Sequence, residues 1–501
     1  METLTKSAYE ELIEEVRRVH HITSVRSLLG WDQRTHMPRK AVKFRAMQYA
    51  ALTEYAYNFI TSDRFVSLLE RAESEGYAEG SRESMNLYWL RRTYEKTVKV
   101  PLDLTLRLIR KTTETEVIWR EAKAKDRPDL VLPHLKEIVE LEREKAAYLG
   151  YESEPYDALL DGYEPGLKAE HVERTFSLLK EETVKLLNRV KEARESGRVP
   201  ETIRGRFPVE DQRRFHLFLL RSIGYDLEAG RLDETTHPFA VRITPGDVRI
   251  TTRYKEDDVT DGIFSTLHEM GHALYEMGVP EEWFGEPVGS TSSLSVHESQ
   301  SRFWENVVGR SPEFWERFYP YLQAFFPSLY DVSVEGFLFA VNDIKPSFIR
   351  IEADELTYNL HIILRFELER DLINGRLNVE DLPEAWNQKF REMFGITPPT
   401  YRQGFLQDIH WFSGSFGYFP TYTFGNVIAA QIRNSMGKDV DIPSAVRSGD
   451  FGVILGWLGE KIHRHGSLYR PMDLVRRATG EDPNPAYLVD YLREKVERFY
   501  G

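Results

Sequence analysis

The stretch FSTLHEMGHALYEMG, residues 264–278, places two histidines and a glutamate within five residues. Apolar residues recur in it at three- and four-residue steps, which predicts a helix with one buried face: Leu267, Met270, Leu274 and Met277. His268 and His272 lie one helical turn apart, so both imidazoles project from the same face and can meet one cation. Glu269 is offset by one residue and can accept a proton from a water held beside that cation. The alternative is a solvated helix face with two ordinary histidines.

Two histidines leave a tetrahedral zinc in need of a third protein ligand. The segment SLSVHESQSRFWENVVG, residues 293–309, offers Glu298 near the first turn of another expected helix. Glu276 and Glu305 are rival ligands. A different interpretation makes Ser295 and Glu298 a capping box, in which the glutamate turns back to its own helix terminus. Spacing alone leaves these alternatives open.

Composition narrows the class of protein. The chain has 501 residues, with 66 Lys and Arg against 80 Asp and Glu and a net charge of -14. No basic surplus is available to neutralise phosphates, which argues against a general nucleic-acid binder. The chain has no cysteine, so disulfides and thiolate metal sites are excluded and a metal must bind to His, Asp or Glu. No stretch reaches the roughly 18 apolar residues of a membrane span, so we expect no membrane partner and a cytoplasmic location.

Most of the chain has helical periodicity. The expected helical segments are 4–30, 40–60, 84–98, 102–124, 130–149, 169–196, 346–372, 379–393 and 424–435. One interval differs: AVRITPGDVRITTRYKE, residues 240–256, alternates apolar and polar residues about Pro245-Gly246. This pattern suits a type II turn and predicts a β-hairpin. Asp261 is the expected N-cap of the helix that follows. We therefore expect one large, mainly α domain with two lobes about a cleft.

The two metal segments belong to a wider pattern. HEMGH followed about one helix later by HESQ, residues 297–300, resembles the Taq-type metallocarboxypeptidases, also called thermostable carboxypeptidase 1. Further segments fit the motifs of this family in the same order: WDQRTHMP (31–38), HPF (237–239), DVRIT (247–251), IRIEAD (349–354), GFLQDIHW (404–411) and FPTYTFGN (419–426). The resemblance therefore extends over most of the chain, and its members are zinc exopeptidases with a glutamate as third ligand.

The resemblance implies that His268, His272 and Glu298 bind one metal ion per subunit and that Glu269 is the general base. It implies zinc as the cofactor, with cobalt able to substitute, and a homodimer. It also implies a mainly α, saddle-like, single-domain fold with a deep groove and a small β-sheet beside the active site. On this basis residues 1–501 form one catalytic domain, with an N-terminal helical region of about 1–230 able to cover the groove and a metal-site region of about 231–430.

Peptide hydrolysis also needs a donor for the oxyanion of the tetrahedral intermediate. Tyr422, in the Gly- and Pro-rich stretch SGSFGYFPTYTF that we expect to be a loop, is the first candidate. Its alternative is an ordinary aromatic residue. His237 is the second candidate; it precedes a proline and is therefore expected to be extended. A structural hydrogen bond is the alternative for His237.

A carboxypeptidase must also bind the free carboxylate of its substrate, which a guanidinium matches with a planar pair of donors. Arg350 and Arg249 are the candidates, the first from an expected helix and the second from the expected strand. Arg350 has a competing partner one helical turn on, Asp354, with which it would form a surface salt bridge. Gln407 and His410 lie three residues apart and are expected to face the groove together.

The sequence thus predicts a metal-dependent carboxypeptidase of broad specificity that releases single C-terminal amino acids from peptides. One alternative is a related helical zinc oligopeptidase that cuts internal or dipeptidyl bonds and needs no carboxylate clamp. Another is a non-catalytic peptide-binding scaffold, whose mark would be loss of the base at Glu269.

Overall fold

The structure is a computed structural model that describes residues 6–501. Helices dominate it. They are α1 Ala8–Thr23, α2 Val25–Thr35, α3 Val42–Ile60, α4 Asp63–Ser74, α5 Arg82–Lys99, α6 Leu102–Lys125, α7 Leu132–Leu149, α8 Pro155–Leu160, α9 Ala169–Glu195, α10 Val209–Ile223, α11 Val259–Gly278, α12 Leu294–Arg302, α13 Pro312–Phe325, α14 Val334–Val341, α15 Tyr358–Ile373, α16 Leu382–Phe394, α17 Pro420–Met436, α18 Ile442–Ser448, α19 Phe451–Lys461, α20 Pro471–Thr479 and α21 Ala486–Tyr500. Among the described residues, no helix is long and apolar enough to cross a membrane.

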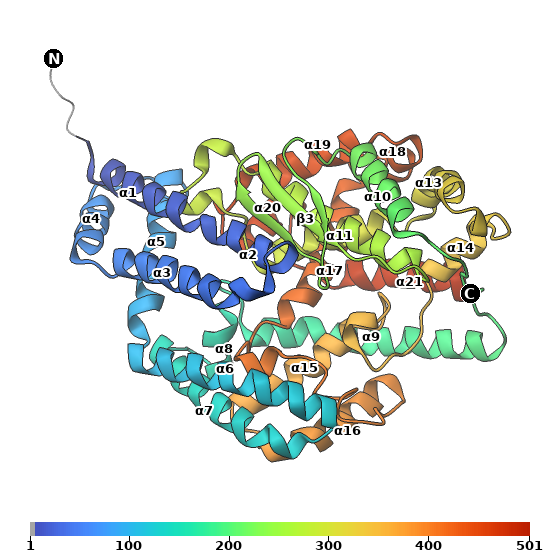
Figure 1. The fold of residues 1–501 in the computed structure, drawn as a ribbon, viewed down its shortest axis with the longest axis horizontal. Helices are drawn as coiled ribbons and strands as arrows, with labels where there is room; N and C mark the ends of the chain where they lie inside the picture. The colour runs from blue at the N-terminus through green and yellow to red at the C-terminus, as the bar shows by residue number, and fades with distance from the viewer. Residues whose placement is uncertain (1–5) are drawn as a thin grey trace.

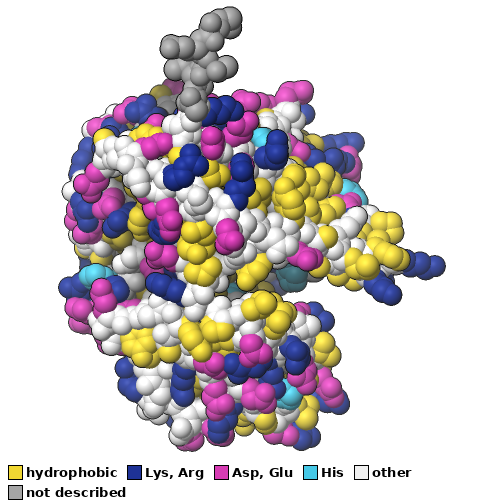
Figure 2. Space-filling view, turned by 90° about the vertical axis from the view of Figure 1, so that its left-hand side faces the viewer, with side chains coloured by type: hydrophobic (Ala, Val, Ile, Leu, Met, Phe, Trp, Pro, Cys, Tyr) yellow, Lys and Arg dark blue, Asp and Glu magenta, His cyan; other side chains and the backbone are white. Residues whose placement is uncertain are grey.

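The helices divide into two parts with a hollow between them. In Figure 1 the sheet and α1–α3, α10 and α11 lie in the upper part, whereas α6, α7, α15 and α16 lie in the lower part. Figure 2, which looks from the left-hand side of Figure 1, shows the surface deeply hollowed between these parts. One continuous apolar core nevertheless joins helices of both parts, from α6 to α21. A smaller cluster joins α1, α4 and α5.

A three-stranded sheet flanks the metal-site helix. Its strands are β1 Leu232–Glu234, β2 Ala240–Thr244 and β3 Asp247–Thr252, in the order β1-β3-β2. Strands β2 and β3 form the expected antiparallel hairpin, and Gly246 at its turn has a φ of 74°, which favours glycine. Strand β1 pairs in parallel with β3, with Leu232 opposite Ile250. The hairpin is confirmed, whereas the short parallel strand was not anticipated.

Helices α11 and α12 pack closely against each other. The N-cap of α11 is Asp258, whose side chain accepts hydrogen bonds from the backbone of Thr260 and Asp261. The expected cap, Asp261, is therefore wrong; it lies in the first turn and pairs with Arg253 at 2.6 Å. The close approach depends on Gly271, because a Cβ atom there would lie 2.5 Å from the carbonyl oxygen of Gln300 on α12.

Two expected elements differ in extent. The segment expected to be helical from 346 to 372 begins with a single 3-10 turn, Arg350–Glu352, and only α15 is a regular helix. Conversely, Tyr422 lies in α17 and not in a loop, because Pro420 occupies the first turn of a helix, where its missing N–H costs nothing. The expected helix over 4–30 divides into α1 and α2 at Ser24, and residues 4–5 lie outside the described part of the chain.

Candidate metal centre and active site

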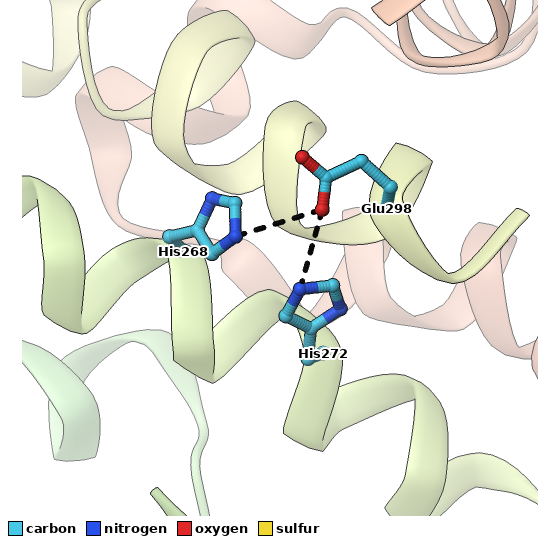
Figure 3. Close-up of side chains that lie close together, drawn as sticks. All are labelled: His268, His272 and Glu298. Atoms are coloured by element: carbon cyan, nitrogen blue, oxygen red, sulfur yellow. Dashed lines mark ion pairs between the residues drawn. The ribbon is translucent and has the colours of Figure 1, made fainter. Parts of the chain in front are cut away.

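Three side chains from α11 and α12 converge on one point (Figure 3). One ligand atom from each of His268, His272 and Glu298 lies within 4.8 Å of the others. Oε2 of Glu298 is 3.6 Å from Nε2 of His268 and 3.4 Å from Nε2 of His272. Ligands about 2.1 Å from one ion in a tetrahedron are roughly 3.4 Å apart, so this spacing suits a zinc-sized cation. The two nitrogens and one carboxylate oxygen are also the donor types that such an ion takes.

The far side of His268 is held by a carboxylate. Oε2 of Glu305 lies 2.9 Å from Nδ1 of His268, so an N–H at Nδ1 leaves Nε2 free for a metal. Glu305 stands on η5, a π-helical turn over Phe303–Val308 that continues α12. Arg302 and Arg310 donate hydrogen bonds to its two oxygens, at 3.3 Å and 3.4 Å. Glu305, one rival ligand, therefore contacts the metal site through His268.

The other sequence alternatives for this region also find their places. Glu276, the second rival ligand, pairs with Nε2 of His297 at 3.1 Å. The N-cap of α12 is Ser293, which accepts a hydrogen bond from the backbone of Val296. The capping-box interpretation of Glu298 is therefore wrong, because the side chain turns toward α11 and not back to its own helix terminus.

Burial and charge set the protonation of the three ligands. Burial, aided by the nearby His297, lowers the pKa of His272 to about 3, so this imidazole is neutral and ready to bind a cation. Burial alone would raise the pKa of Glu298, but Arg302 and both histidines hold it well below its usual range. Burial opposes charge on His268 too, yet Glu298 and Glu305 raise its pKa. A metal must therefore displace a proton from His268.

Glu269 lies next to this group on α11 and is buried. Burial, with the nearby Glu298 and Glu305 carboxylates, raises the pKa of Glu269 to about 7. A carboxylate with a pKa near the working pH is suited to taking up and returning a proton. A dication at the three ligands would favour its ionised form. The arrangement can therefore polarise a carbonyl and activate a water for attack.

Comparison with known proteins agrees with this geometry. Residues 11–496 match the family described as Carboxypeptidase Taq (M32) metallopeptidase. The chain belongs to this family. It is 47% identical over 511 residues to thermostable carboxypeptidase 1 of Thermus thermophilus, covering 99% of each chain, and 40% identical to carboxypeptidase 1 of Bacillus subtilis, covering 98% of each. The solved carboxypeptidase of Pyrococcus furiosus matches with a TM-score of 0.95 at 39% identity, over 99% of this chain and 100% of that one. The protein is thus an M32 metallocarboxypeptidase.

A second buried charge cluster of this M32 enzyme contains one of the predicted arginines. Arg350, only 6% exposed, donates to Asp408 through Nη2 at 2.8 Å. Arg365 on α15 binds the other oxygen of Asp408 through Nη2 at 2.6 Å. Nη1 of Arg350 also donates to the Tyr358 hydroxyl at 3.2 Å. Two guanidiniums around one carboxylate leave a net positive charge in the cluster.

The expected Arg350–Asp354 salt bridge is wrong. Asp354 instead accepts hydrogen bonds from the backbone of Leu356 and Thr357, where α15 begins. Gln407 holds the backbone of Arg350 through its side-chain oxygen at 2.8 Å. Gln407 is itself buried, so it fixes the arginine from behind.

Aromatic rings gather beside this cluster. The ring of Tyr422 lies 5.2 Å from the guanidinium carbon of Arg350 and 5.2 Å from the ring of Tyr418. The ring of His410 lies 6.4 Å from that of Tyr422 and 4.5 Å from that of Phe419. Burial lowers the pKa of His410 to about 4, so this ring is neutral. Tyr422 and His410, predicted separately, thus lie together with Arg350.

The remaining two predicted residues lie on the sheet. Arg249 pairs with Asp247 through Nε at 2.7 Å, and its guanidinium lies 4.2 Å from the ring centroid of Trp31. His237 is exposed at the bend before β2. Both stay predictions as substrate or catalytic residues.

Sequence reasoning missed the residues that orient the site. Arg302 and Glu305 lie four and seven residues after Glu298, so helical spacing placed them on the same face as that ligand. No such local signal existed for Arg365, because its partner Asp408 is distant in the chain and the two meet only through the fold.

Proposed function

We propose that this M32 metallocarboxypeptidase uses one zinc ion to release single C-terminal amino acids from peptides of broad sequence. The convergence of His268, His272 and Glu298 beside the buried Glu269 is the observation that carries the proposal. A zinc ion held there supplies Lewis-acid activation of the water and of the scissile carbonyl. Zinc is preferred to cobalt because two imidazoles and a carboxylate form its usual catalytic ligand set.

The proton transfers belong to Glu269. As general base it takes a proton from the attacking water, and it then gives a proton to the departing amine. Its burial supports both steps, because a carboxyl with a pKa of about 7 holds and releases a proton at neutral pH. Tyr422 is proposed as the donor to the developing oxyanion, since its hydroxyl keeps its proton: burial raises its pKa well above the usual value. His237 is the second candidate for this role.

Substrate recognition is assigned to the cluster around Arg350. Because Arg350 and Arg365 share the single Asp408, the cluster carries one positive charge that a substrate carboxylate would neutralise. His410 is proposed to line this site, with Gln407 fixing the position of Arg350. Arg249 is the alternative clamp, although it already has a bidentate partner in Asp247.

Mass spectrometry of two versions of one peptide tests this function. One version has a free C-terminal carboxylate, the other an amide, and each is incubated with zinc-loaded wild type and with Glu269→Gln. We expect stepwise loss of single residues from the free peptide, and a rate about 10²–10⁴-fold lower in the variant. Internal or dipeptide cuts in both peptides would favour the related oligopeptidase activity and leave Arg350 without its role.

Two broader assignments complete the proposal. A homodimer is supported by α3, which has no buried residue yet exposes Phe44 and Met47 at 66% and 60%; light scattering after gel filtration tests it. A cytoplasmic location suits a chain without cysteine, and cell fractionation tests it.

A further inference from the structure

The two oxygens of the ligand Glu298 face different partners. Oε2 points between the two histidines, 3.6 Å from His268 and 3.4 Å from His272. Figure 3 shows this oxygen directed at both rings and the other directed away from them. Oε1 accepts a hydrogen bond from Nε of Arg302 at 2.7 Å. The carboxylate is thus shared between the metal site and a guanidinium.

Arg302 is held firmly in this position. Its Nη1 donates to Glu305 at 3.3 Å, and its guanidinium lies 4.7 Å from the ring centroid of Tyr358. It stands four residues after Glu298 on the same helix, so the two side chains are neighbours along one face. Its side chain is only 15% exposed. Leaving Glu298 would cost Arg302 a charge-assisted hydrogen bond in a buried setting.

The number of oxygens that Glu298 offers matters for catalysis. A carboxylate can bind a cation with one oxygen or with both. Two histidines and both oxygens would fill the four positions of a tetrahedral site, whereas a catalytic site keeps one position open for water or substrate. We propose that Arg302 holds Glu298 as a one-oxygen ligand and so keeps that position open. Arg302 is a positioning residue in this scheme, because it acts through Glu298. The proposal rests on the three-residue metal site.

The proposal makes an unusual prediction about affinity. Arg302 is a cation next to a cation site, and it withholds one ligand oxygen. Its removal therefore frees Oε1 and relieves repulsion, so metal binding becomes tighter or stays unchanged while turnover falls. If Arg302 only kept Glu298 in place, its removal would weaken metal binding. The sign of the change separates the two roles.

Cobalt(II) is the probe, because the intensity of its visible absorption falls as its coordination number rises. We compare wild type, Arg302→Met and Arg310→Met. Arg310 is the matched control, since it also contacts Glu305 but not Glu298. In Arg302→Met we expect weaker cobalt absorption, a dissociation constant equal to or below that of wild type, and a kcat lower by about 10–100-fold. Arg310→Met is expected to keep the wild-type spectrum.

Each outcome has a distinct meaning. An unchanged cobalt spectrum in Arg302→Met, or a metal dissociation constant raised tenfold or more, would overturn the role of Arg302. A wild-type protein that binds no cobalt would overturn the metal site itself. If Arg302→Met fails to fold, a crystal structure of zinc-loaded wild type decides: we expect Oε2 of Glu298 at about 2.0–2.2 Å from zinc and Oε1 still on Arg302, whereas two oxygens at ligand distance would sink the proposal.

Discussion

Glu305 Oε2 lies 2.9 Å from Nδ1 of His268, on the opposite side of the imidazole from Glu298. The contact fixes the tautomer of a metal ligand and raises its basicity. We expect Glu305→Ala to weaken zinc binding by about 10–100-fold, measured by competition with a chromophoric chelator. Glu276→Ala is the matched control, because Glu276 is also a buried carboxylate on a histidine, His297, that is not a ligand. Equal losses in both variants would contradict a specific role for Glu305.

A hydroxyl next to the proposed carboxylate pocket gives the second prediction. If Tyr422 donates to the oxyanion, Tyr422→Phe should lower kcat by about 10²–10³-fold and leave KM nearly unchanged, because the hydrogen bond forms only in the transition state. Steady-state kinetics on a short peptide measure both constants. Tyr418→Phe, in the neighbouring ring 5.2 Å away, is the control and should retain most of kcat. A fall in Tyr418→Phe alone would assign the donor to that residue.

Tight packing against the metal ligand gives the third prediction. A Cβ at Gly425 on α17 would lie 2.4 Å from Cγ of Glu298, so alanine there must displace either the helix or the ligand. We expect Gly425→Ala to lower the free energy of unfolding by about 1–3 kcal/mol and to weaken zinc binding. Urea unfolding and chelator competition measure these effects.

Gly456 on α19 is the matched control for Gly425. A Cβ there meets nothing within 4 Å. Alanine should therefore be neutral or raise the free energy of unfolding by about 0.5–1 kcal/mol, through the lower entropy of the unfolded chain. A stable Gly425→Ala with wild-type zinc affinity would show that α12 can shift without cost.

The sequence was most informative where the signal was local. The metal ligands on α11 followed from one-turn spacing, and the hairpin followed from alternation about Pro245-Gly246. Tyr422 was placed in a loop because glycine and proline surround it, although Pro420 is a signal for the start of a helix. The partner of Arg350 was mistaken because i,i+4 spacing favoured Asp354, while Asp408 arrives from a distant segment. Contacts between segments far apart in the chain leave no trace in local periodicity.

The shared carboxylate of Asp408 gives a pH-dependent prediction. Burial alone would raise its pKa, but Arg365 and Arg350 hold it well below its usual range. A carboxyl with a lowered pKa stabilises the fold at pH values above its unfolded pKa of about 3.9, and this contribution is lost as the pH falls further. In metal-free protein at pH 7, Asp408→Asn should lower the free energy of unfolding by about 3–5 kcal/mol, because two buried guanidiniums lose their partner.

Urea unfolding of both proteins between pH 7 and pH 3.5 measures this difference. We expect it to be constant down to about pH 5 and to shrink below about pH 4, where the wild type loses its advantage. Asp482→Asn is the control, because Asp482 pairs with Arg476 at the surface and is 65% exposed; solvent screening should make its effect far smaller. A difference for Asp408→Asn that stayed the same at every pH would mean that lost packing, and not the charge shared by Arg350 and Arg365, sets the stability of this cluster.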